Sequence, residues 1–142
     1  MLGEIVQRLK TQVPALDGRV QSAAGLAEML SARGLPQNST TFVVPLGLQA
    51  RPADDASGLF TQEFTETIGV LLVARVTDQA GSKALEEIRP LLQSVIAAIA
   101  GWTAGGAFGV FELRRGTLVG IRNGALIYML EFSITDQLRI AT

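Results

Sequence analysis

Two adjacent carboxylates, Asp54 and Asp55, come nearest in this sequence to a pattern that could do chemistry. They could act as paired carboxylates or form one edge of a metal site. A hard metal ion, however, needs further oxygen ligands at defined spacing, and none accompanies this pair. We therefore interpret Asp54 and Asp55 as solvated residues, and the adjacent Glu86 and Glu87 in the same way.

The sequence lacks the residues that nucleophilic catalysis and phosphate binding need. The chain has no histidine and no cysteine, which removes the commonest general base, thiolate nucleophiles, disulfides and zinc–thiolate sites. A serine or threonine hydroxyl without a neighbouring base is a weak nucleophile. Gly105, Gly106 and Gly109 resemble half of a phosphate-binding loop, but no Lys-Ser or Lys-Thr pair follows them. The sequence therefore predicts that the protein is not an enzyme and holds no metal or cofactor.

The remaining notable side chains suit contacts between proteins. Trp102 directly follows a long helical pattern, where it either closes the helix end over the core or anchors a subunit contact, since tryptophan is common among interface hot spots. Arg114 and Arg115, with Arg122 nearby, form a small basic cluster across a predicted hairpin. That cluster is either solvated or meets an acidic neighbouring subunit.

Composition favours a subunit of something larger. A chain of 142 residues predicts a single domain, residues 1–142. Hydrophobic residues make up 48% and charged residues 18%, against about 25% charged in a typical domain. Either the core is unusually full or other subunits cover apolar surface, and a small interior favours the second reading. The net charge of −1 suggests no tight nucleic-acid binding. No apolar run approaches the roughly 20 residues needed to span a bilayer, so we expect a soluble, cytoplasmic protein.

Apolar periodicity divides the chain into helices and strands. Steps of three and four residues predict helices, whereas alternation and β-branched or aromatic runs predict strands. The predicted helices are 2–13, 24–34 and 82–100, and the predicted strands are 18–23, 39–46, 61–76, 110–115, 117–122 and 125–137. This order, α-(β)-α-β-β-α-β-β-β, predicts an α+β fold with a mixed or antiparallel sheet and helices packed against one face.

Two predicted elements carry specific expectations. The helix 82–100 contains Pro90, which predicts a kink or an irregular first half. Its core stripe is expected to consist of Leu85, Ile88, Leu92, Val95 and Ile99. The second half of the strand 61–76 is apolar on both faces, which predicts that other elements cover it on both sides.

Residues 47–60, between two predicted strands, read as an extended loop. Proline and glycine punctuate this segment, which disfavours a helix or a strand. A compact domain rarely keeps so long a connection without a use for it. We expect the loop to extend from one end of the sheet and to order against a neighbouring molecule. Arg51, Asp54 and Asp55 would then supply charged contacts that set register more than affinity.

Three short motifs follow one another along this order of elements: "VVPLG" at 43–47, "GW" at 101–102 after the long helix, and "GALIYMLEF" at 124–132. The arrangement resembles the small tail terminator proteins of tailed bacteriophages and prophages, in particular those found with Mu-like and siphophage tail operons. The resemblance covers nearly the whole chain. Pro90 departs from the resemblance, because the corresponding helix of the family is expected to be straight. The family has no catalytic residue to carry over.

The resemblance implies an α+β subunit that assembles into a hexameric ring in the host cytoplasm. The ring caps the head-proximal end of the virion's tail tube, stops tube polymerisation and offers a surface to head-completion proteins. Its partners are then further copies of itself, the tail tube protein and a head–tail connector protein, and DNA passes through the lumen without sequence-specific binding. Arg51, Asp54, Asp55, Trp102, Arg114 and Arg115 are the predicted interface residues.

Two alternatives remain. The chain could be another virion structural subunit, such as a tail-tube or head–tail connector protein, which would repeat along the tail axis or occupy another ring. It could also be a small-molecule or peptide-binding module, or an enzyme without histidine, which would show a closed apolar pocket with convergent polar groups.

Overall fold

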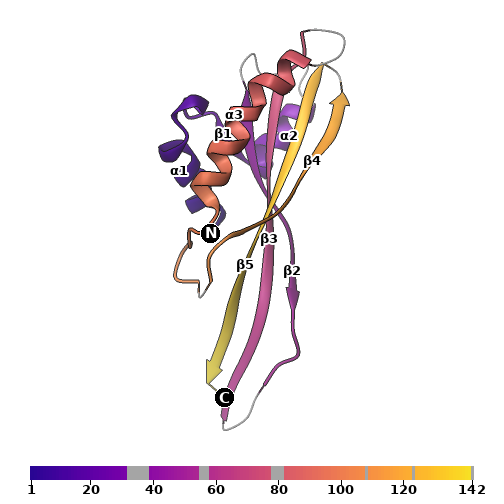
Figure 1. Ribbon diagram of the computed structural model, residues 1–142. Coiled ribbons are helices and arrows are strands. Elements are labelled where there is room, and N and C mark those ends of the chain that lie inside the picture. The colour runs from indigo at the N-terminus through magenta and orange to yellow at the C-terminus, as the bar shows by residue number, and fades with distance from the viewer. Residues whose placement is uncertain (32–38, 55–57, 78–81, 108, 123, 142) are drawn as a thin grey trace.

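The computed structural model describes residues 1–31, 39–54, 58–77, 82–107, 109–122 and 124–141 (Figure 1). These residues form one mixed sheet of five strands in the order β1-β2-β3-β5-β4, accompanied by three α-helices. The elements are α1 (Leu2–Gln12), a 3-10 turn (Pro14–Leu16), β1 (Val20–Ser22), α2 (Ala23–Ser31), β2 (Thr40–Ala50), β3 (Leu59–Arg75), α3 (Ser82–Ile99), β4 (Glu112–Arg122) and β5 (Ala125–Ala141). β1 runs parallel to β2, and the other neighbours are antiparallel. The predicted α+β class and order of elements are confirmed.

The helices cover both faces of the sheet. α1 and α3 pack on one face, where Ile5 and Ile88 join a buried cluster with Val70 of β3. α2 packs on the other face, where Phe42 and Val73 form a second cluster with half-buried residues of α2. Since successive strand residues point to opposite faces, the two clusters lie on opposite sides of the sheet. The prediction of helices on one face therefore holds for α1 and α3 only, and the apolar half of β3 is covered on both sides as predicted.

The buried stripe of α3 differs from the predicted one by a rotation about the helix axis. The helix runs through Pro90 to Ile99. Its buried residues are Ala84, Ile88, Leu91, Val95, Ala98 and Ile99. Leu85 is 40% exposed and Leu92 is only half-buried. Both series step by three and four residues, so periodicity alone could not choose between Leu91 and Leu92.

Half of the β3–β5 ladder extends beyond the helices. The two strands pair along their full 17 residues, from Leu59↔Ala141 to Arg75↔Ala125. The helix-distant part, with the end of β2 beside it, projects from the body as a three-stranded extension (Figure 1). We call this extension the arm and define it as residues 46–50, 59–67 and 135–141. At about 3.4 Å per residue, its β3 strand is about 27 Å long.

The predicted loop 47–60 is wrong at both of its ends. Gly47–Ala50 continue β2, and β3 begins at Leu59. A register shift between Pro45 and Gly47 lets the ladder resume after a proline that cannot donate a hydrogen bond. The proline and glycine therefore mark a bulge and not the end of the strand.

The segments 110–115 and 117–122, predicted as two strands, form the single strand β4 with no turn at Gly116. Gly116 pairs with Leu130. A Cβ atom there would lie 3.0 Å from the ring of Tyr128, so this glycine leaves room for a neighbouring aromatic side chain. The predicted hairpin between β4 and β5 is confirmed by their antiparallel register, although Asn123 lies outside the described residues.

Candidate functional site

The arm carries apolar side chains on the face that continues the α3 side of the sheet. Phe60 pairs with Ile140 and Gln62 with Leu138, so their side chains share one face with buried Ile68 further along β3. The apolar members of this face are Leu48, Phe60, Phe64, Leu138 and Ile140. Leu48 is 61% exposed and Ile140 is 52% exposed. No helix in the described part of the chain covers this face, which leaves an apolar surface open.

The opposite face of the arm is mainly polar, although Leu46 and Leu59 are exposed on it, and its charged side chains make contacts within the chain. Thr65 and Thr135 place their hydroxyl oxygens 3.3 Å apart across β3 and β5. The Nε atom of Arg51 lies 3.4 Å from Oε1 of Glu63. Arg139 donates from Nε to the side-chain oxygen of Gln137. The two faces of the arm therefore differ in character, one being mainly apolar and the other mainly polar.

A second apolar surface lies at the other end of the sheet, beside α3. It is a groove of about 430 Å³ whose lining includes Leu85, Leu92 and Tyr128 as apolar residues and Glu86 and Arg89 as charged ones. We call it the groove. Leu85 and Leu92 flank the buried stripe of α3, which is why they face this space and not the core.

The apolar surface continues from the groove onto β4. Leu118 pairs with Tyr128 and shares its face of the sheet. Leu118 and Ile121 are both exposed. β4 is an edge strand, so its α3-side residues extend the open apolar surface outward from Tyr128.

Trp102 closes the C-terminal end of α3. Its ring stacks on Phe111 with centroids 5.9 Å apart, and the guanidinium of Arg8 lies 5.0 Å from the ring centroid. Arg8 also donates from Nε to the carbonyl of Ala98 in the last turn of α3, at 2.9 Å. Trp102 is half-buried against the main core. The structure thus places it as a lid on the core, and its role in a subunit contact stays a prediction.

The two predicted interface arginines of β4 already have acidic partners. Arg115 donates from Nε to the carboxylate of Glu131, and this hydrogen bond and charge raise the pKa of the guanidinium above its ordinary value. Arg114 lies 3.9 Å from Glu112. The predicted basic cluster across a hairpin is wrong, because Arg122 stands on the same strand seven positions away, about 23 Å along it.

The predicted carboxylate pair is only partly described. Asp54 exchanges two backbone hydrogen bonds with Thr61, of 2.8 and 2.7 Å, and so prolongs the β2–β3 ladder. Asp55 lies outside the described residues. Among the residues that the structure does describe, no group of three or more His, Cys, Asp or Glu side chains could hold a metal ion. None of the helices described is long and apolar enough to cross a membrane.

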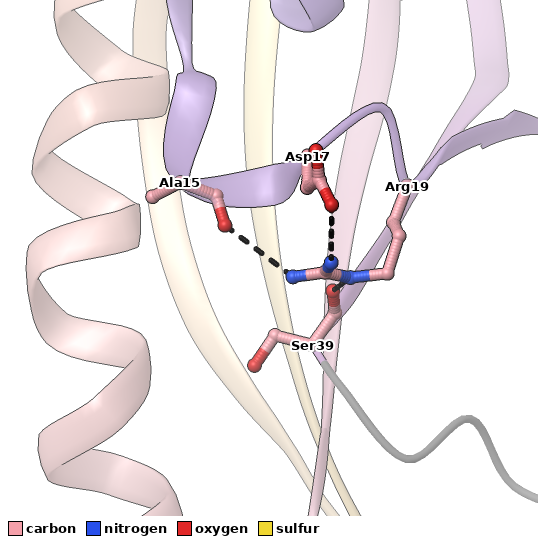
Figure 2. A network of polar contacts seen from close by, with 4 residues as sticks. All are labelled: Ala15, Asp17, Arg19 and Ser39. Atoms are coloured by element: carbon pink, nitrogen blue, oxygen red, sulfur yellow. Dashed lines mark hydrogen bonds and ion pairs between the residues drawn. The ribbon is translucent and has the colours of Figure 1, made fainter.

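A polar network that the sequence gave no signal for secures the N-terminal region. Figure 2 shows Arg19 reaching three groups: it donates from Nε to the carbonyl of Ser39 at 2.9 Å and from Nη2 to that of Ala15 at 3.3 Å, and it lies 3.9 Å from Asp17. Ser39 in turn donates to Glu87 of α3. These contacts tie the 3-10 turn, the start of β2 and α3 together, which is a structural role.

The predicted interface residues do not form one site. Arg51 and Asp54 lie in or beside the arm, Trp102 lies at the end of α3, and Arg114 and Arg115 lie on the edge strand. The apolar arm face and the groove were both missed. Alternation in the sequence marked the strands, but only the placement of α3 shows which of their residues stay uncovered.

The family model described as "Phage tail terminator protein" matches residues 2–142. Among solved structures, a similar fold occurs in a chain of the "Virion of native gene transfer agent (GTA) particle", with a TM-score of 0.58 and 16% sequence identity. That match covers 94% of this chain and 92% of the other, and at this identity it shows a shared fold alone. No curated protein sequence matches the chain.

Proposed function

The chain belongs to the phage tail terminator family, and we propose that six copies form a ring that caps the head-proximal end of a tail tube. The ring stops tube polymerisation and offers its other face to head-completion proteins. The observation that carries this proposal is the match of the family model over residues 2–142, essentially the whole chain.

The uncovered apolar surfaces support a role in assembly. Soluble monomers rarely expose large contiguous apolar patches, and such patches mark sites of protein contact. Here Leu48 and Ile140 on the arm and Leu85 and Leu118 beside α3 are all at least 40% exposed. A subunit that buries these residues against other virion proteins accounts for the high hydrophobic and low charged content of the chain.

The charged residues predicted at the interface suit contacts that set the orientation of neighbouring molecules more than the strength of binding. Arg51, Arg114 and Arg115 each have an acidic partner in their own chain. If these side chains form ion pairs with a neighbouring molecule, the pairs set the orientation and register of the two molecules more than their affinity. With a net charge of −1, the chain also lacks the excess of positive charge that would hold passing DNA.

The proposal is tested by adding the purified protein to tubes growing from the tail tube protein of the same phage or prophage. We expect tube length to stop increasing and electron microscopy to show one six-fold ring at one end of each tube. The control is the same tube protein without the addition. Repeated rings along the tube would identify a tube subunit instead, and a strictly two-fold dimer at the tube end would overturn the proposed ring.

A further inference from the structure

We propose that the apolar face of the arm of one copy occupies the groove of the next copy, an inference that rests on the proposed ring. The contact pairs the apolar arm face with the groove, two apolar surfaces that the described residues leave open. Leu138 and Ile140 of the arm would face Leu85 and Tyr128 of the groove.

The arm cannot reach the groove of its own chain. Tyr128 and Leu138 both point to the α3 side of the sheet, but they stand ten positions apart on the uninterrupted ladder of β3 and β5. At about 3.4 Å per residue this places them about 34 Å apart. An arm that occupies the groove must therefore come from another molecule, and a second copy brings such an arm.

A contact between two different surfaces of the same chain is heterologous. Such a contact leaves each copy with one free arm and one free groove, so assembly continues until rotation closes a ring. A symmetric contact of arm with arm, or groove with groove, would stop at a dimer. The placement of the two surfaces at opposite ends of the sheet is therefore suited to the proposed ring.

The edges of the sheet formed by β4 and β2 are poorly suited to join copies by strand pairing. β4 carries two register shifts, one between Leu113 and Arg115 and one between Leu118 and Gly120. The open edge of β2 carries Pro45 and a register shift beside it. Bulges and edge prolines are devices that prevent edge-to-edge pairing of strands. Strand pairing along the outer edge of β5 in the arm, 135–141, would leave Leu138 and Ile140 uncovered, whereas contact through the apolar faces buries them.

Charge supports the same pairing of surfaces. Glu66 and Asp136 belong to the α3-side face of the arm, since they pair with Ile134 and Phe64 of that face. Arg89 lines the groove. An acidic residue of the arm face would thus meet Arg89 in the groove of the next copy and lie away from Glu86, which also lines the groove, so charge would orient the arm in it.

Cysteine cross-linking tests the contact, because the natural chain has no cysteine. A chain with both Leu138→Cys and Leu85→Cys is oxidised, both in concentrated solution and on capped tubes. We expect a ladder of disulfide-linked oligomers that ends at one discrete closed species. Each single variant should give no product larger than a dimer. The pair Ile140→Cys with Leu118→Cys is a second version of the same experiment, with different disulfide geometry.

The matched control moves one cysteine to the polar face. Gln137→Cys lies next to Leu138 but points to the opposite side of the sheet. Combined with Leu85→Cys, it should give no ladder. The inference is overturned if neither designed pair gives a ladder in either sample, or if the Gln137→Cys control gives an equal one.

The same samples separate this inference from the proposed function. Capped tubes whose rings give no ladder would refute the arm–groove contact and leave the capping function intact. A ladder from a protein that never stops tube growth would refute the capping function and leave the contact intact. If a thiol-to-amine reagent on Leu138→Cys instead joins the arm to a tube subunit, the arm binds the tube and the inference is wrong.

Discussion

Replacing Trp102 with alanine tests whether the end of α3 is closed by core packing. The substitution removes the stack on Phe111 and the ring beneath the guanidinium of Arg8. It leaves untouched the backbone hydrogen bonds that fix this corner, in which Trp102 donates to Ile99 and accepts from Phe111. The chain should therefore keep its fold and lose stability.

The expected loss follows from three contributions. An aromatic stack is worth about 0.5–1.5 kcal/mol beyond the area it buries. An arginine over an exposed or half-exposed ring adds about 0.5–1 kcal/mol. Full burial of a large apolar side chain contributes about 1.5–3 kcal/mol, and about half of that applies to a half-buried ring. The free energy of unfolding should fall by about 2–4 kcal/mol, which overlaps the usual range of about 3–5 kcal/mol for truncating a buried tryptophan.

Urea unfolding followed by far-ultraviolet circular dichroism measures this loss. Fluorescence cannot be used, since Trp102 is the only tryptophan in the chain. Trp102→Phe is the matched control: it keeps an aromatic ring on Phe111 and should lose clearly less stability than alanine. Arg8→Met completes a double-mutant cycle with Trp102→Ala, whose coupling should be about 0.5–1 kcal/mol.

A loss below about 1 kcal/mol would refute this reasoning, because it would fall under even the lower bound of the summed contributions. If such a variant also failed to form rings, Trp102 would be an interface anchor and not a lid on the core. A large loss with normal ring formation by the remaining folded protein would exclude the anchor role.

Three further predictions follow from single contacts. Ile88→Ala should lower the free energy of unfolding by about 2–5 kcal/mol, whereas Leu85→Ala should change it by less than about 1 kcal/mol; equal losses in urea unfolding would contradict the observed rotation of α3. Gly109→Ala should cost about 1–3 kcal/mol, because the added Cβ would lie 2.8 Å from the carbonyl oxygen of Thr135; an unchanged urea midpoint would show that the backbone there moves freely. Glu131→Gln should leave stability almost unchanged at moderate salt, since the Arg115 side chain it contacts is largely exposed; a large, salt-independent loss would contradict that view.

The sequence by itself determined the types and order of the elements. Apolar residues recur every three or four positions along α3 and alternate along β3 and β5. These periods follow from the local geometry of a helix or strand and do not depend on what the element packs against. The family resemblance also depended on this order. Residues 70–73 are apolar on both faces of β3, and this correctly predicted that both faces are covered there.

Only the tertiary structure decided where strands end and which apolar residues remain open. Gly47 and Gly116 read as breaks in the sequence, yet pairing with Thr67 and Leu130 keeps both within strands. These pairings join residues distant in sequence, and their hydrogen bonds outweigh the weak local preference of a glycine for turns. In the same way, a strand pattern cannot say how far a helix reaches over it. The apolar arm face exists because α3 covers one half of the β3–β5 ladder and leaves the other half bare. The groove exists because α3 packs with Leu85 and Leu92 beside its buried stripe. Both features follow from packing between elements and not from a local property of the chain.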